Sequence, residues 1–159
     1  MAATKKNANI RIAWKPLSST AKKPCKPKSP DDAGFDLYSD EDKVVIKPHK
    51  TVLIKTGYAM QMTAPDGWNA FAEIKDTSGN AYKQKLSTKG GVIDIGYDGN
   101  VGVVIRNNNM FKKIVISRGD KIAQIIPFAI PEVEEVEWVD KTTVRGSDGY
   151  GSTGVAGSK

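Results

Sequence analysis

Ile114-Val-Ile-Ser-Arg-Gly-Asp-Lys-Ile-Ala-Gln-Ile-Ile-Pro-Phe128 is the stretch of the sequence that decides the fold. It contains two runs rich in β-branched residues, Ile114–Ile116 and Ile122–Phe128, and such side chains favour strands. Gly119-Asp120 lies between the runs, and this pair is typical of a tight turn. The stretch therefore predicts two short strands joined by a turn.

The same pattern continues on both sides of this stretch. Further short apolar runs are Ile10–Trp14, Val44–Ile46, Thr51–Thr56, Val101–Ile105 and Val133–Trp138. Turn residues separate them at Pro48-His49, Pro65-Asp66-Gly67, Gly99-Asn100 and Asn107-Asn108-Asn109. No stretch keeps a 3.6-residue apolar period over ten or more residues with a cap at each end. Many short strands with frequent turns predict an all-β sandwich, jelly roll or barrel.

The composition indicates one domain inside a cell. The length of 159 residues favours a single domain, and 39% hydrophobic with 26% charged residues is an ordinary balance. No apolar run approaches the roughly 20 residues of a membrane span, and no apolar segment follows Lys5 and Lys6 as in a secretory signal. Cys25 is the one cysteine, so no internal disulfide can form. We therefore expect an intracellular protein without membrane contact.

The net charge of +6 is concentrated at the amino terminus. Residues 1–30 hold eight basic residues and no acidic one, which leaves 16 basic and 18 acidic residues in the rest of the chain. Four prolines interrupt this start, so it reads as a solvated segment, or alternatively as an import or anion-binding stretch around Lys22–Lys28. Because the body is slightly acidic and lacks interleaved aromatics, a nucleic-acid-binding barrel is disfavoured.

The carboxyl-terminal stretch Arg145–Gly154 differs from the rest of the chain. It places four glycines in ten residues, together with an arginine, an aromatic residue and three hydroxyl side chains. Glycine adds nothing to a core, yet it lets a backbone approach and wrap an anion closely. A frayed tail is the alternative interpretation.

Several familiar catalytic arrangements are disfavoured. His49, the one histidine, lies in the turn-like Lys47-Pro-His-Lys50, so a Ser-His-Asp or Cys-His arrangement has no support, and one histidine with one cysteine cannot make an ordinary zinc site. There is no GxxxxGK[ST] phosphate loop. The remaining carboxylates, hydroxyls, glycines and arginines suit a polyphosphate bound with Mg²⁺.

Five clusters carry these groups. They are Ala33–Ser39, Thr77–Ala81, Gly91–Gly99, Arg118–Gln124 and Arg145–Gly154. Their order and spacing resemble the five motifs of the trimeric dUTPase family over residues 33–154. The resemblance implies a jelly-roll-like β barrel that forms a homotrimer, with active sites at subunit interfaces. It also implies Mg²⁺-dependent hydrolysis of dUTP to dUMP and pyrophosphate, which limits uracil in DNA and supplies dUMP for dTMP synthesis.

The resemblance assigns roles to individual residues. Asp94 matches the carboxylate that activates the attacking water, although alone it would also fit an ordinary turn aspartate; after the apolar Val92-Ile93 we expect it to be partly desolvated. Tyr97 matches the aromatic residue against the deoxyribose, and the backbone of about Thr88–Gly91 matches the uracil-reading hairpin. Asp36 matches an acid tied to the metal through water, the metal itself being held chiefly by phosphates. The other substrate contacts would be Ser78, Gly79, Gln124, Arg145, Tyr150 (over the uracil), Gly151, Ser152 and Thr153.

The second motif departs most from the family pattern. Asp76-Thr77-Ser78-Gly79 stands where Pro-Arg-Ser-Gly is usual, so a phosphate-binding arginine is missing unless Lys75 or Arg118 substitutes. Gly96 replaces an aspartate and Asp148 replaces a glycine, with less consequence. A weakly catalytic regulatory homologue and a dCTP deaminase-like enzyme are the alternative functions. The expected organisation is a disordered basic start at 1–7, a barrel at 8–144 and a Gly-rich arm at 145–159 that closes over an active site.

Overall fold

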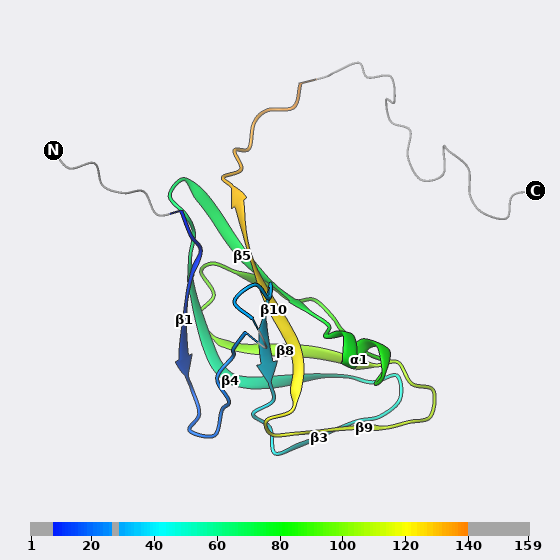
Figure 1. The fold of residues 1–159 in the computed structure, drawn as a ribbon. Coiled ribbons are helices and arrows are strands. Elements are labelled where there is room, and N and C mark those ends of the chain that lie inside the picture. Colours follow the sequence, from blue (N-terminus) through cyan, green and yellow to red (C-terminus); the bar gives the residue numbers. More distant parts are fainter. Residues whose placement is uncertain (1–7, 27–28, 140–159) are drawn as a thin grey trace, which may run out of the picture.

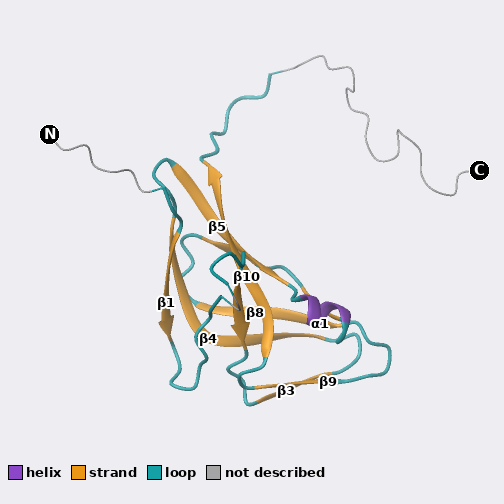
Figure 2. Cartoon of the chain, in the orientation of Figure 1, coloured by secondary structure: helices purple, strands orange, loops and turns teal. Residues whose placement is uncertain are grey.

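Antiparallel strands make up nearly all regular structure in residues 8–26 and 29–139, the parts of the chain that this computed structural model describes (Figures 1 and 2). The strands are β1 (Arg11–Pro16), β2 (Phe35–Tyr38), β3 (Lys43–Ile46), β4 (Thr51–Thr63), β5 (Trp68–Lys75), β6 (Leu86–Thr88), β7 (Val92–Asp94), β8 (Asn100–Asn107), β9 (Ile114–Ser117) and β10 (Lys121–Pro131). One short helix, α1 (Ser78–Tyr82), follows β5.

Two four-stranded sheets and a two-stranded sheet form a jelly-roll-like barrel. The first sheet has the order β1-β4-β8-β6, the second has the order β2-β10-β5-β7, and β3 pairs with β9. The alternation of partly and fully buried residues along β8 is the period-two pattern of a strand with one face in a core. The core between the sheets is apolar: Leu37, Ile54, Val103 and Ile125 are each at most 1% exposed.

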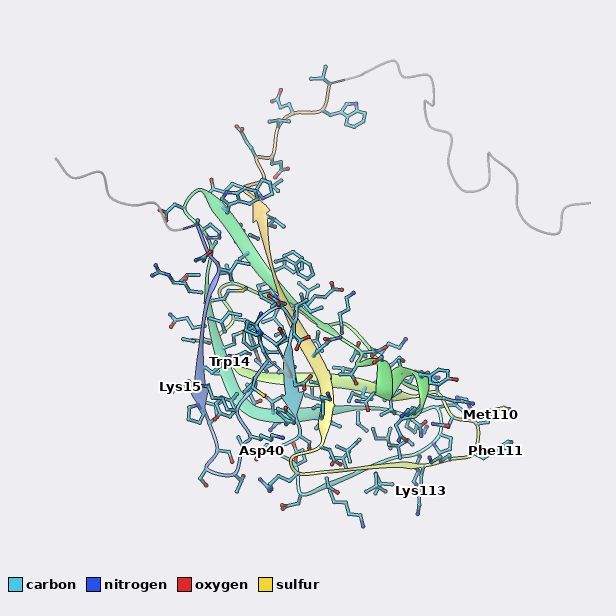
Figure 3. All side chains as sticks on the ribbon, in the orientation of Figure 1. Trp14, Lys15, Asp40, Met110, Phe111 and Lys113 are labelled. Atoms are coloured by element: carbon cyan, nitrogen blue, oxygen red, sulfur yellow. The ribbon has the colours of Figure 1, made fainter. Side chains whose placement is uncertain are left out.

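Two fully buried polar side chains, Thr56 and Asn107, are hydrogen-bonded where the ladders are interrupted or end. The β4–β8 register shifts between Lys55 and Ala59, and the buried Thr56 hydroxyl there donates to the Val101 carbonyl at 2.7 Å. The buried Asn107 amide donates to the carbonyls of Ile46 and Lys112, at 2.9 and 2.8 Å. The two Asn107 bonds fix the loop between β8 and β9. Met110, Phe111 and Lys113 of this loop project away from the sheets (Figure 3).

Six of the seven predicted strands are confirmed, and the seventh is wrong. Val133–Trp138 forms no strand; the chain leaves the barrel after β10 (Figure 1), with Val133 and Trp138 each 87% exposed. Its glutamates are exposed as well, so the segment has no apolar face turned toward this barrel. Four strands, β2, β5, β6 and β7, were not among the predicted runs. In β5 small alanines alternate with larger residues and weaken the β-branched signal. The helix α1 was not predicted because it is too short to show a period.

Turns at Pro48-His49, Pro65–Gly67 and Gly119-Asp120 connect strands as predicted. The turn expected at Gly99-Asn100 lies instead at Ile95-Gly96, and Asn100 already belongs to β8. The basic start 1–7 and the arm 145–159 lie outside the described residues. Within the described part, no helix is long and apolar enough to cross a membrane.

Candidate functional site

Predicted phosphate and metal residues lie on the strands beside the carboxyl end of β5. Gln124 of β10 is in register with Asp36 of β2 on one side and with Lys75 of β5 on the other. We call these three residues the polar row. The Gln124 side-chain amide donates to the Asp76 carbonyl at 3.0 Å, which connects β10 with the chain that leads into α1.

Ser78 and Gly79 begin α1 and are exposed. The helix starts there because Thr77 caps it: its hydroxyl accepts from the Asn80 N–H at 3.4 Å. The Asn80 side chain donates to the carbonyls of Lys121 and Ile122 at 3.0 Å, which holds α1 against the start of β10. Ser78 and Gly79 are therefore presented beside Gln124, and a Cβ on Gly79 would meet no atom within 4 Å.

Asp36 is buried, with 5% of its surface exposed. Its carboxylate forms an ion pair with the Lys121 ammonium at 3.1 Å, and its backbone N–H donates to the Cys25 carbonyl at 2.8 Å. Among the described residues, no group of three His, Cys, Asp or Glu side chains could hold a metal ion.

Asp94 lies at the end of β7 and is exposed. In the single chain the expected partial desolvation is thus wrong, because Val92 is turned outward with it and is 61% exposed. Asp94 is in register with Phe71, and Phe71 with Phe128, so the three side chains share the outer face of this sheet. We call them the aromatic row; the two phenyl rings stack at 5.2 Å between centroids.

Tyr97 is held just after Asp94. Its N–H donates to the Asp94 carbonyl at 3.0 Å, and its hydroxyl donates to the Asn100 carbonyl at 2.9 Å. A Cβ on Gly99 would lie 2.6 Å from that hydroxyl, so glycine is needed beneath the ring. The ring is fixed yet 44% exposed, which leaves a flat surface for a ligand.

The segment Thr88–Gly91 crosses from one sheet to the other. Gly90 and Gly91 have φ values of +66° and +110°, which favour glycine, and a Cβ on Gly91 would lie 3.0 Å from the Ile74 carbonyl. The Lys89 N–H donates to the Val104 carbonyl at 2.9 Å, and the Gly91 carbonyl accepts from the Ile74 N–H at 2.8 Å. The Thr88 N–H donates to the Asp76 carboxylate at 2.6 Å. Within the described part of this segment, the N–H groups that donate to no other protein group are those of Gly90 and Gly91.

The two expected substitutes for the missing arginine differ in position. Arg118 is engaged elsewhere: it pairs with Asp40 at 2.7 Å and with Asp42 at 2.5 Å, and it also donates to the Thr20 hydroxyl. It cannot serve the polar row without breaking this cluster. Lys75 belongs to the polar row and is half exposed, although its ammonium pairs with Glu73 at 2.5 Å. Of the two, Lys75 is therefore the one that lies in the polar row, where a phosphate would have to displace Glu73 to reach its ammonium.

The polar and aromatic rows are well separated in one chain. Gln124 and Phe128 are four residues apart on β10, which is about 13 Å along a strand. The fold thus joins Asp36, Gln124, Ser78 and Gly79, and it places Asp94 farther along the same sheet. Arg145, Tyr150, Gly151, Ser152 and Thr153 lie outside the described residues. Asp76, to which the sequence assigned no role, contacts both Thr88 and Gln124.

Comparisons with known proteins identify relatives of the whole chain. A profile of the dUTPase family matches residues 20–154 of the chain. The deoxyuridine 5'-triphosphate nucleotidohydrolase of Vaccinia virus (strain Copenhagen) is 39% identical over 151 residues, which cover 94% of this chain and 97% of the viral protein. The mitochondrial deoxyuridine 5'-triphosphate nucleotidohydrolase of Homo sapiens is 43% identical over 124 residues, which cover 77% of this chain and 46% of the human protein.

Solved structures show the same barrel. A mutant dUTPase of Staphylococcus bacteriophage 80alpha with dUpNHpp superposes with a TM-score of 0.73 at 30% identity, covering 91% of this chain and 99% of the phage chain. A mutant dUTPase of phage phi11 of S. aureus, whose structure concerns the coordination of a structural Mg(II) ion, gives a TM-score of 0.68 at 28% identity. The match covers 82% of this chain and 99% of the phi11 chain.

Proposed function

The chain belongs to the dUTPase family, and on this premise we propose that it hydrolyses dUTP to dUMP and pyrophosphate with Asp94 as the catalytic base. One observation carries the assignment of the base: Asp94 is accessible, directly follows the Gly90-Gly91 turn, and is joined through its backbone to Tyr97. The catalytic base, the aromatic ring for the sugar and the turn that reads the uracil would thus come from one short segment.

The chemistry requires a proton acceptor next to the α-phosphorus. Asp94 takes a proton from water, the water oxygen bonds to the α-phosphorus, and the bond to the bridging oxygen breaks as pyrophosphate leaves. A positioned base of this kind contributes about 10²–10⁴-fold to the rate. Ser78, Gly79 and Gln124 would bind the phosphates, with Lys75 as the nearby cation; Arg145, Ser152 and Thr153 would complete the contacts.

Selectivity for deoxyuridine follows from the turn and from Tyr97. Because Thr88 and Lys89 already donate within the protein, the base would be read by Gly90 and Gly91. A cytosine would leave a donor or acceptor of this turn unpaired, and unpaired buried polar groups are costly. The Tyr97 ring would pack against the deoxyribose and refuse a 2′-hydroxyl, while Tyr150 would cover the uracil.

The cation that fits these residues is Mg²⁺ bound mainly by the triphosphate. Mg²⁺ keeps several waters and commonly relies on substrate phosphates, and the described residues offer it no cluster of acidic ligands. Asp36 would contact it through water at most, since its carboxylate is buried against Lys121. When bound, the ion neutralises charge on the phosphates.

A homotrimer explains why the site residues are apart in one chain. The outer face that carries Asp94 is apolar: Val92, Phe71 and Phe128 are at least partly exposed on it. The segment after β10 exposes Val133, Val136 and Trp138 as well. In a closed ring, a second copy would cover this face, desolvate Asp94 and supply the other site residues.

The proposal is tested by pyrophosphate release from dUTP, dCTP, dTTP and UTP, measured beside nucleotide binding. We expect turnover of dUTP alone. Tight dUTP binding without turnover would instead favour a regulatory homologue, and deamination of dCTP would favour the deaminase relative.

A further inference from the structure

Asp76 occupies a junction between the segments that bind substrate. It directly follows β5 and precedes the Thr77 cap of α1. Its carboxylate accepts from the Thr88 N–H at 2.6 Å, and its carbonyl accepts from the Gln124 side chain at 3.0 Å. One half-buried residue therefore contacts the base-reading turn and Gln124, and it stands just before Ser78 and Gly79.

The contact to Thr88 satisfies a backbone N–H group that the sheet order leaves without a strand partner. β6 is the edge strand of the β1-β4-β8-β6 sheet, so one side of it has no neighbouring strand. Thr88 is in register with Ile105, and the next ladder bond on the β8 side comes from Lys89 N–H to the Val104 carbonyl. The Thr88 N–H points to the opposite side, where Asp76 meets it. A carboxylate acceptor makes this bond stronger than an amide would.

The turn that follows is anchored on both sides. Lys89 is bonded to the first sheet through Val104, and Gly91 is bonded to the second sheet through Ile74. Asp76 adds a third anchor at Thr88, two residues before Gly90; the two glycines have the most adaptable backbones in the segment. Loss of this anchor releases Thr88 while leaving the other two bonds in place.

We propose that Asp76 is a positioning residue for base recognition, acting through Thr88 to hold the Gly90 and Gly91 N–H groups in place. The inference rests on the proposed function, since it assigns a role within that site. It is particular to this chain, because Asp76 stands where the family pattern has a proline. The base is bound away from the reacting phosphorus, so the effect falls on substrate affinity and base selectivity.

The test compares Asp76→Ala and the isosteric Asp76→Asn with Ser87→Ala in the full-length protein. Ser87 is the matched control, because its hydroxyl accepts from the Asn108 side chain at 3.0 Å on the same edge strand without touching the turn. The measurements are kcat and KM for dUTP and dCTP, affinity for dUMP, and amide hydrogen exchange at Thr88.

We expect Asp76→Ala to raise KM for dUTP about tenfold with kcat within about twofold, and to lower the preference for dUTP over dCTP by a similar factor. Asp76→Asn keeps an acceptor and should show about a threefold change. Thr88 exchange should accelerate in both, and Ser87→Ala should leave affinity and selectivity unchanged.

Faster Thr88 exchange with unchanged dUMP affinity and unchanged base preference overturns the role of Asp76. An equal loss of affinity in Ser87→Ala also overturns it, because general loosening of β6 would then suffice. A parent protein that binds dUMP without hydrolysing dUTP contradicts the proposed reaction instead, and the dUMP affinities still decide the role of Asp76.

Discussion

The polar row and the aromatic row lie on the same sheet but are stabilised differently. Asp36 and Gln124 are fixed by their own chain, through Lys121 and through the Asp76 carbonyl. Asp94, two strands from Gln124 and farther along the sheet, is exposed beside the Phe71–Phe128 stack. The first region is organised before any association, whereas the second presents a reactive group on an apolar surface. In the proposed trimer, the phosphate end would belong to the single barrel and the catalytic end to the assembly.

The strongest test of the aromatic row is Asp94→Asn. We expect turnover to fall by at least about a hundredfold, because the proton acceptor is lost, while dUTP binding remains close to that of the parent. Single-turnover hydrolysis and equilibrium binding should be measured together. Asp98→Asn, in the exposed loop after β7, is the matched control and should keep parental turnover. Hydrolysis by Asp94→Asn within about tenfold of the parent would remove Asp94 from its assigned role.

The second prediction asks whether different subunits complete the site. Asp94→Asn protein and a protein truncated after Val144 should each be inactive, since one lacks the base and the other lacks the arm. Refolded together, they should regain activity in about one quarter of sites, because random assortment in a closed ring pairs an intact base with an intact arm at that frequency. Near-zero activity in mixed trimers confirmed by mass would mean that base and arm come from the same chain.

The third prediction sharpens the polar row. Lys75→Met should raise KM for dUTP several-fold with kcat little changed, because Lys75 is the available cation beside Gln124. Thr77→Arg in that background should restore affinity, at some loss of the α1 cap. Arg118→Gln is the control and should leave KM unchanged, since Arg118 is committed to Asp40 and Asp42. If neither Lys75→Met nor Thr77→Arg changed KM for dUTP, no cation would be needed at this position.

The smallest expected effect concerns acid stability at the ion pair of Arg118 with Asp40, outside the polar row. Burial alone would raise the pKa of Asp40, but hydrogen bonds from Thr20 and Ser18 and the Arg118 guanidinium outweigh it and hold this pKa below its usual 3.8. A lowered carboxyl pKa stabilises the fold above pH 3.8, and the contribution is lost as the pH falls through the lowered value. Arg118→Gln should therefore melt a few degrees lower than the parent at pH 6, and the difference should narrow below about pH 4. A constant difference across this range would contradict the assignment.

Prediction from sequence worked where the chain obeys local rules. In runs such as Val101–Ile105, fully and partly buried residues alternate along the strand. Gly119-Asp120 forms a turn for steric reasons that a few neighbouring residues already indicate. Prediction from sequence failed where the structure of a segment depends on contacts with residues far away in the sequence. Val133–Trp138 has strand-forming residues but no neighbour in the described residues, and Asp94 is exposed because its apolar neighbours face outward.

Site residues were foreseeable to the extent that they belong to family motifs. The roles of Asp76 and Lys75 could not be separated from sequence, because each depends on which strands lie in register. Asp76 reaches Thr88 only since β6 is an edge strand beside the end of β5. The exclusion of Arg118 similarly depends on Thr20, Asp40 and Asp42 meeting it from distant parts of the chain.

The place of β10 within its sheet governs when the protein can fold during synthesis. β10 lies between β2 and β5, although it is the last strand of the described chain to be translated. Until Lys121–Pro131 has left the ribosome, β2 and β5 have no common neighbour and the core around Ile125 stays open. The second sheet can therefore close only after Lys121–Pro131 has emerged, and a nascent chain that stops before Pro131 would expose the apolar core.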